Sequence, residues 1–477
     1  MKKLLLAVFS IATTFSLYAQ REVPQERMEQ IYEEVKTPYK YGLAVAPADN
    51  YHKIDCPTVF RQGDKWLMTY VVYNGKGGTD GRGYETWIAE SDNLLEWRTL
   101  GRVLSYRDGK WDCNQRGGFP ALPDMEWGGS YELQTYKGRH WMTYIGGEGT
   151  GYEAVKAPLY VGLAWTKGNI STAHEWESLD KPILSIHDKD AQWWEKLTQY
   201  KSTVYWDKDK TLGAPFVMYY NAGGHHPETN LKGERVGIAL SKDMKTWKRY
   251  SGNPVFAHEA DGTITGDAHI QKMGDVYVMF YFSAFEPSRK YKAFNTFAAS
   301  YDLVNWTDWK GADLIIPSKN YDELFAHKSY VVKHDGVVYH FYCAVNNAEQ
   351  RGIAIATSKS MGRSAVRFPV PESKNRRQIM TLNEGWKTWI TEATHLKGNF
   401  MMPAKTVNIP HNWDDYYGYR QLTHGNLHGT AMYVKDFTAD VKSGKRYFLR
   451  FEGVGTYATI TVNGKNFGRH PIGRTTL

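Results

Sequence analysis

The 477-residue chain has few cysteines: Cys56, Cys113 and Cys343 are the full set. Their number is odd and no Cys-x-x-Cys pair occurs, so the sequence predicts neither a disulfide framework nor a zinc site. We expect buried free thiols instead. No metal and no cofactor is expected for this chain.

Long apolar runs and concentrated charge are also scarce. After the first twenty residues no apolar run is long enough to cross a bilayer, so no membrane insertion is expected. The formal net charge is +8, but the one dense basic tract is Lys374-Asn-Arg-Arg377. Because nucleic-acid binding needs a basic stripe or patch, we expect no nucleic-acid partner. The mild positive charge is compatible with a weak preference for acidic polysaccharide.

Five similar segments recur along residues 54–360. Each begins with a short apolar strand containing Ala, most continue through Ser-x-Asp or a close variant, and the first four end on Trp. The segments are Ile88–Trp97, Gly162–Trp176, Glu234–Trp247, Phe297–Trp306 and Gly352–Ser358. A β-rich hairpin with a polar turn precedes each copy. Repetition of four antiparallel strands predicts a five-bladed β-propeller, because the alternative β-sandwich does not require a repeated signal.

The pattern divides the chain into segments. Residues 1–19 carry a positive start, the apolar run Leu4–Leu17 and a small residue at Ala19, which is typical of a signal peptide. Residues 20–360 form the propeller, with a polar lead-in over 21–50, a short helix over Glu26–Lys36 and a loop insertion over Asp112–Gly129. Residues 361–377 are predicted to be a linker. Alternating strands over 378–477, with an Asn463-Gly464 turn, predict an incomplete β-sandwich that continues beyond Leu477 in the natural chain.

Strand order places function on one face of the propeller. The first turn of each blade is short, whereas the loops between second and third strands are long and differ between blades. These loops and the starts of the first strands bring carboxylates and histidines to one mouth. The candidates are Asp55, Glu85, Glu148, Glu153, Glu234, Asp267, His225, His226, His269 and His327. Clustered carboxylates among many aromatic residues are typical of carbohydrate hydrolysis.

The motifs resemble two carbohydrate-active families. Asp55 at the first inner strand and the repeated Ser-x-Asp…Trp resemble the propeller glycosidases around glycoside hydrolase family 43, although blade 3 starts with Lys201-Ser-Thr-Val and blade 4 with Gly266-Asp-Ala-His. Asn408-Ile-Pro-His-Asn-Trp413 and Val462-Asn-Gly-Lys465 resemble the sugar-binding domain of family 2. The combined order resembles the family 137 β-L-arabinofuranosidases of rhamnogalacturonan II breakdown.

That resemblance implies a glutamate pair at the mouth. We assign Glu153 and Glu234 as acid and as nucleophile or base, in an order left open, because both lie in long loops of adjacent blades. Substrate binding is assigned to Asp55, Glu148, His225, Asp267, His269 and His327. The partner is an oligosaccharide or polysaccharide. The alternatives are a family 43-like α-L-arabinofuranosidase or other pentosidase, and a carbohydrate-binding propeller without catalysis.

The signal sequence predicts export. Cleavage should occur near Ala19-Gln20, and the processed protein should be found in the periplasm or outside the cell. N-terminal sequencing of protein from each cell fraction checks this. Unprocessed protein recovered from the cytoplasm would contradict the prediction.

Overall fold

The computed structural model divides into two units, Met1–Ser373 and Lys374–Leu477, which are described separately. The described residues are 22–74, 81–152, 158–370, 379–393, 403–412, 429–451, 453–455 and 457–470. The predicted signal peptide lies outside them. No helix in these ranges is long and apolar enough to cross a membrane.

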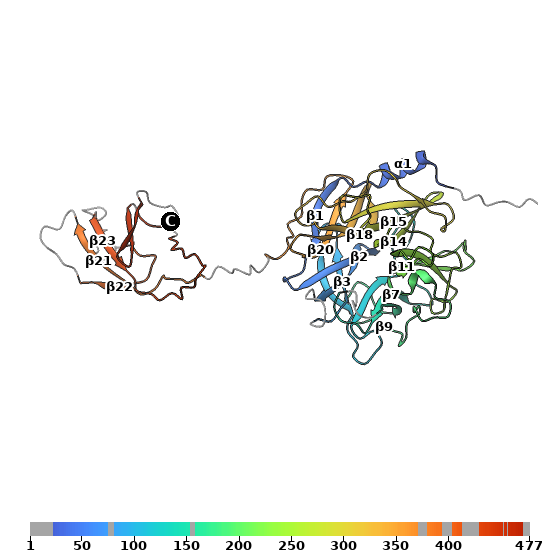
Figure 1. The fold of residues 1–477 in the computed structure, drawn as a ribbon, viewed down its shortest axis with the longest axis horizontal. Helices are drawn as coiled ribbons and strands as arrows, with labels where there is room; N and C mark the ends of the chain where they lie inside the picture. The colour runs from blue at the N-terminus through green and yellow to red at the C-terminus, as the bar shows by residue number, and fades with distance from the viewer. Residues whose placement is uncertain are drawn as a thin grey trace, which may run out of the picture. The chain divides into compact units, whose positions relative to one another are not determined.

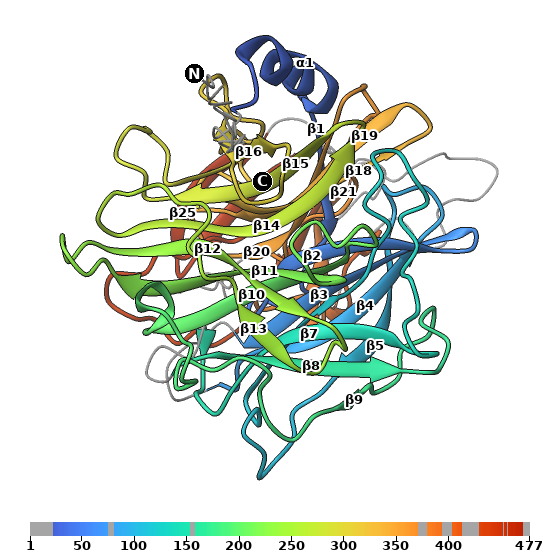
Figure 2. The same cartoon turned by 90° about the vertical axis from the view of Figure 1, so that its right-hand side faces the viewer.

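The first unit is a β-propeller of five four-stranded blades (Figure 1 and Figure 2). Blade 1 contains β2 (His52–Gln62), β3 (Lys65–Asn74), β4 (Glu85–Ser91) and β5 (Arg98–Leu104). Blade 2 contains β6 (Gln115–Pro120), β7 (His140–Gly147), β8 (Tyr160–Thr166) and β9 (Glu177–Ser178). Blade 3 contains β10 (Thr198–Trp206), β11 (Phe216–His225), β12 (Lys232–Ser241) and β13 (Trp247–Arg249).

The remaining blades follow the same order along the chain. Blade 4 contains β14 (Thr263–Met273), β15 (Val276–Ala284), β16 (Ala293–Ser300) and β17 (Thr307–Asp308). Blade 5 contains β18 (Phe325–His334), β19 (Val337–Val345), β20 (Arg351–Thr357) and, as its outer strand, β1 (Tyr39–Val45). Blades 3 and 4 are joined by a short parallel pairing between β12 and β14. The predicted propeller fold is therefore confirmed.

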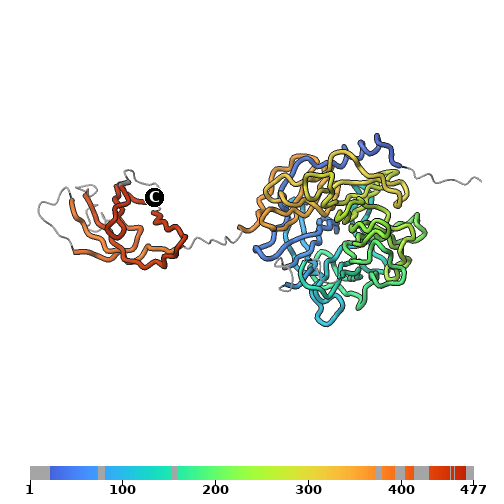
Figure 3. The backbone as a smooth tube through the Cα atoms, viewed as in Figure 1, coloured from blue at the N-terminus to red at the C-terminus, as the bar shows by residue number. Residues whose placement is uncertain are grey.

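The N-terminal segment closes the ring. Strand β1 pairs antiparallel with β20, with Tyr39 opposite Thr357, and Figure 1 labels the two strands next to each other. In Figure 3 blue N-terminal chain and orange chain from the last blade meet in this part of the unit. Helix α1 (Gln25–Val35) is close to the predicted helix and buries Met28, Ile31 and Val35. The lead-in predicted over residues 21–50 was wrong in missing β1. This strand also explains why the fifth repeat lacks a Trp-ended outer strand of its own.

Blade 2 corrects a second prediction. Strand β6, its innermost strand, lies inside the segment 112–129 that the sequence assigned to a loop insertion. Its glycines, Gly117 and Gly118, misled the prediction because glycine disfavours strands. The long segment is instead the connection 121–139 between β6 and β7. It runs over the face opposite the mouth, where the backbone of Glu126 forms a β-bridge with that of Lys272 in blade 4, and the backbone of Glu132 forms one with that of Arg61 in blade 1.

The repeated Ser-x-Asp…Trp signal forms a turn at the end of the third strand. In blade 3 the Asp243 carboxylate accepts hydrogen bonds from the backbone N–H groups of Lys245 and Thr246. The Trp247 ring then donates to the carbonyl of Met244 at 2.8 Å. This turn packs the Trp against the blade core and starts the outer strand, so the repeated tryptophans have a structural role.

The segment predicted as a linker begins as part of the propeller. Ser364 is buried, its hydroxyl donates to the carbonyl of Leu43, and its N–H donates to the carbonyl of Tyr41. Gln350 donates to the carbonyl of Pro369 at 2.6 Å. Residues 361–370 therefore cover the outer edge of blade 5. The described structure resumes at residue 379.

The second unit contains two small antiparallel sheets among its described residues. One contains β21 (Trp386–Ala393), β22 (Lys405–Val407) and β23 (Gly429–Val434), and the other contains β24 (Ala458–Val462) and β25 (Lys465–His470). Of its described side chains, Thr388 and Ile390 are buried. These strands agree with the start of the predicted β-sandwich.

We expect ring closure by β1 to stabilise the propeller. Leu43 is 2% exposed and packs in the core shared by α1 and blades 4 and 5. The Leu43→Ala substitution should lower the free energy of unfolding by about 2–5 kcal/mol, because it leaves a cavity. Tyr39→Ala, in the same strand but 50% exposed, is the matched control and should change it by less than about 0.5 kcal/mol. Urea unfolding followed by tryptophan fluorescence measures both, and equal effects would contradict the closure argument.

Candidate active site

The long loops and the starts of the inner strands share one face, as the sequence predicted. In each of four blades the first residues of the inner strand pair with the last residues of the second strand. The pairs are His52 with Asn74, Thr198 with Gly223, Ile264 with Ala284 and Phe325 with Val345. This face is the mouth of the propeller, and the inner strands run from it towards the opposite face.

A β-bulge interrupts the inner strand at the same place in blades 1, 3, 4 and 5. Its first residue is Cys56, Tyr200, Asp267 or Lys328 in the respective blades. Cys56, Asp267 and Lys328 have positive φ angles of 53°, 57° and 59°. Such a conformation is costly for a residue with a side chain and clusters at functional sites. The bulges bring charged side chains together near the mouth.

Asp55, just before the first bulge, is the centre of one charged cluster. It is fully buried, and its Oδ2 accepts hydrogen bonds from Lys328 Nζ at 2.8 Å and from Arg351 Nη1 at 2.9 Å. Its Oδ1 accepts the N–H of Cys56 at 2.9 Å. Burial alone raises the pKa of this carboxyl, but the charges of Lys328 and Arg351 outweigh it and hold the pKa well below its usual range.

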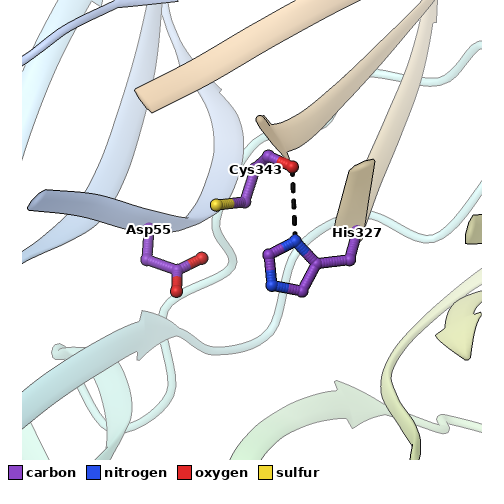
Figure 4. Close-up of side chains that lie close together, drawn as sticks. All are labelled: Asp55, His327 and Cys343. Atoms are coloured by element: carbon purple, nitrogen blue, oxygen red, sulfur yellow. Dashed lines mark hydrogen bonds between the residues drawn. The ribbon is translucent and has the colours of Figure 1, made fainter. Parts of the chain in front are cut away.

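Asp55, His327 and Cys343 bring three potential metal ligands within 4.8 Å of one another (Figure 4). The His327 Nδ1 lies 3.3 Å from the carbonyl oxygen of Cys343, and burial lowers the pKa of His327 to about 3. Burial also raises the pKa of the Cys343 thiol, which disfavours the thiolate. Because both oxygens of Asp55 are already hydrogen-bonded, two of those bonds from cations, a divalent ion here would meet strong repulsion. These three residues do not fit a metal site.

A pocket of about 220 Å³ lies above this cluster, between blades 1 and 5. Tyr152, from the blade 2 loop, closes one side: its hydroxyl accepts from Arg351 Nη1 at 3.0 Å, and its ring stacks on Tyr73 with centroids 5.0 Å apart. The guanidinium of Arg351 lies 4.6 Å from the Tyr152 ring. The lining residues are Lys53, Tyr73, Tyr152, Leu324, Phe325, Val345, Glu349 and Arg351. Aromatic faces beside charged donors are suited to a sugar ring.

A second cluster joins blades 3 and 4. Glu234 Oε2 accepts from Asn221 Nδ2 at 3.1 Å, and Asn221 Oδ1 accepts from the N–H of Asp267 at 3.3 Å. The Asp267 carboxylate lies 3.5 Å from Lys201 Nζ, and both side chains are buried. Gly266 permits this approach, since a Cβ at that position would lie 2.6 Å from Asn221 Nδ2. Glu234 is thus fixed at the mouth by a hydrogen-bonded chain that reaches the inner strands.

The structure separates the other predicted residues. Glu148 and His225 have exposed side chains on the mouth loops. His269 lies deeper along its strand, where it stacks on Tyr330 at 3.8 Å and hydrogen-bonds the carbonyl of Val331. Burial lowers its pKa to about 3, so the buried ring is neutral.

Three further candidate residues are Glu85, His226 and Glu153. Glu85 forms an ion pair with Arg102 at 3.0 Å, and His226 packs edge-on against Trp193. Glu153 lies outside the described residues, although the preceding residue, Tyr152, is placed at the pocket. The structure thus brings Asp55 and His327 together in one cluster and Glu234 and Asp267 in another.

Sequence reasoning missed the basic half of the site. Lys201, Lys328 and Arg351 carry the positive charges, and Asn221 connects Glu234 to Asp267. Lys201 and Lys328 lie in the bulges of blades 3 and 5, and these correspond to the bulges of blades 1 and 4 beside which Asp55 and Asp267 lie. The corresponding segment of each repeat was therefore an available signal, which a focus on carboxylates and histidines overlooked.

Comparison with known proteins identifies the class. A solved structure of BT0996 described as an RGII complex matches with 95% identity and a TM-score of 0.73, over 74% of this chain and the full length of the other. A second, described as a glycoside hydrolase, matches with the same values. A thermostable family-43 glycoside hydrolase matches with a TM-score of 0.46 and 16% identity, over 69% of this chain and 99% of the other. No protein-family model and no curated protein matches.

The propeller and its charged mouth are those of an enzyme that acts on carbohydrate. The chain belongs to the glycoside hydrolases.

We expect the cluster around Asp55 to be a stability determinant that depends on pH. Asp55→Asn leaves two buried cations without their counter-ion and should cost about 3–5 kcal/mol of unfolding free energy at pH 7. Since the folded-state pKa is lowered, the stabilisation by Asp55 is complete above the unfolded-state pKa of about 4 and is lost as the pH falls below it. The difference between wild type and Asp55→Asn should therefore be constant from about pH 5 to 8 and shrink in more acidic solution.

A double-mutant cycle isolates the ion pair. Lys328→Met combined with Asp55→Asn should destabilise by less than the sum of the single changes, with a coupling of about 1–3 kcal/mol. Urea unfolding at several pH values measures each free-energy difference. Additive effects, or a difference that grows in acid, would show that Asp55 is not held by these cations.

Proposed function

We propose that the enzyme is an exo-acting β-L-arabinofuranosidase that removes terminal arabinofuranose from side chains of rhamnogalacturonan II. The observation that carries this proposal is the 95% identity to a protein whose structure is described as an RGII complex. The order of a divergent propeller followed by a family 2-like sandwich supports the same activity. We further propose that the enzyme works in the periplasm or outside the cell, as its signal sequence predicts.

The pocket supports an exo mode of action. At about 220 Å³ it has room for about one sugar ring rather than for a length of polysaccharide. Of the ion-paired groups, Arg351 lines the pocket, and its partner Asp55 is buried and also pairs with Lys328. Arg351 is preorganised to bind a group of the substrate glycan, because its hydrogen bonds to Asp55 and Tyr152 fix it before substrate arrives.

Catalysis in this proposal uses Glu153 and Glu234. One protonates the leaving oxygen, and the other acts as nucleophile or as base. Glu234 is partly buried and held by Asn221, so its carboxylate has a fixed orientation at the mouth. Tyr152, which precedes Glu153 in the chain, lines the pocket. The backbone N–H of Asp267 supports Glu234 through Asn221.

Glutamine substitutions test this assignment. Glu153→Gln and Glu234→Gln keep the side-chain shape but remove the acid–base function, so kcat should fall by at least about 10²-fold on an aryl β-L-arabinofuranoside. Glu228→Gln is the matched control, because Glu228 is exposed in the same loop that leads to Glu234. Product chromatography and circular dichroism measure activity and folding.

The outcome separates the alternatives. Turnover near wild type in both glutamine variants would refute the catalytic pair and make Asp55 and Asp267 the next pair to test. Activity on α-linked arabinofuranosides alone would favour the α-L-arabinofuranosidase alternative. Binding of the glycan with no hydrolysis by the wild-type enzyme would favour a carbohydrate-binding propeller.

A further inference from the structure

Two cations, Lys53 and Arg351, line the pocket between blades 1 and 5. The nearby carboxylates are Asp55, beneath the pocket, and Glu349, at its rim. Asp55 is fully buried, and one of its carboxylate oxygens accepts hydrogen bonds from both Lys328 and Arg351. Two positive side chains, Lys53 and Arg351, therefore line the same small pocket. The carboxylate that pairs with Arg351 is shared with Lys328.

Arg351 presents an unused hydrogen-bonding edge. Within the described residues its hydrogen bonds come from Nη1, which donates to Asp55 and to the hydroxyl of Tyr152. Its Nε and Nη2 donate to no described group. A guanidinium edge with two parallel N–H donors matches the two oxygens of a carboxylate. The Tyr152 ring and Asp55 hold the guanidinium plane, so this edge has a fixed direction.

Lys53 supplies a second donor at the same pocket. Its ammonium makes no hydrogen bond to a described residue, and its ion-pair partner Glu349 lies 4.0 Å away with a side chain that is 76% exposed. Burial lowers the pKa of Lys53, and the nearby charge of Arg351 lowers it further. The two cations repel each other, and an anion bound between them would relieve that repulsion.

We propose that this pocket binds the carboxylate of an acidic sugar in the substrate glycan, with Arg351 and Lys53 as its ligands. The inference rests on the proposed function, which it deepens by naming the substrate class: a terminal arabinofuranose carried by a glycan that has a uronic or similar acid sugar nearby. Glu349, at the solvent edge, opposes the anion and limits its affinity. Neutral sugar hydroxyls are the competing occupant of the same donors.

Two matched substrates test the proposal. One is an acidic pectic oligosaccharide that ends in β-L-arabinofuranose, and the other is the same oligosaccharide after chemical reduction of its carboxyl groups to alcohols. The measured quantity is the ratio of kcat/KM on the acidic form to kcat/KM on the reduced form. For wild type we expect a ratio well above one that falls as salt is added, because screening weakens charge pairing.

Substitutions in the pocket test whether Lys53 and Glu349 cause this ratio of kcat/KM values. Lys53→Gln should lower it by about tenfold, in line with the loss of one charge-assisted hydrogen bond, and Lys53→Arg should restore most of it. Glu349→Gln should raise the ratio, since it removes a negative charge from the rim. Lys232→Gln, an exposed lysine on the mouth side of blade 3, is the control and should leave the ratio unchanged.

The results distinguish failure of the inference from failure of the proposed function. Equal loss on both substrates in Lys53→Gln would mean that Lys53 contacts hydroxyls, and no loss on either would mean that it contacts nothing; both overturn the inference. If the wild-type enzyme hydrolyses neither substrate, the proposed function fails. Titration calorimetry then compares binding of the two oligosaccharides: preference for the acidic form that depends on Lys53 upholds the subsite, and equal binding overturns it.

Discussion

The contact on which the site depends is the sharing of one carboxylate oxygen of Asp55 by Lys328 and Arg351. Asp55 comes from blade 1 and the two cations from blade 5, so the interaction crosses the seam where the ring closes. A buried charge must be paired to be tolerated, and here each partner is also a functional candidate. The same interaction therefore holds two blades together and fixes Arg351 at the pocket.

The sequence was sufficient to predict the repeated blades but not the two strands that depart from the repeat. The Ser-x-Asp…Trp turns predicted the blades because each carries a local signal: a capping carboxylate and a tryptophan that fills the blade core. Strand β1 and strand β6 were missed for opposite reasons. The pairing of β1 with β20 is long-range and leaves no local mark. Strand β6 contains two glycines and is buried on both faces, so its sequence looks like a loop.

The site was predictable on its acidic side only. Asp55, Asp267 and Glu234 were found because strand order places them at the mouth and because carboxylates are expected in glycosidases. Lys328 and Arg351 come from far along the chain, and their meeting with Asp55 depends on bulges that tilt individual side chains. Sequence periodicity cannot show such bulges, since they shift the register without changing composition.

The closure of blade 5 by β1 has a consequence for how the enzyme becomes active. Tyr39 is synthesised early, and its partner Thr357 follows more than three hundred residues later. Contacts so distant in sequence form slowly, because a long loop must close first. The pocket lined by Lys53, Tyr152 and Arg351 takes side chains from blades 1, 2 and 5, so it cannot exist in a partly formed ring. Catalytic activity therefore requires the complete ring of five blades. The time at which activity first appears during refolding measures how long the last step of assembly takes.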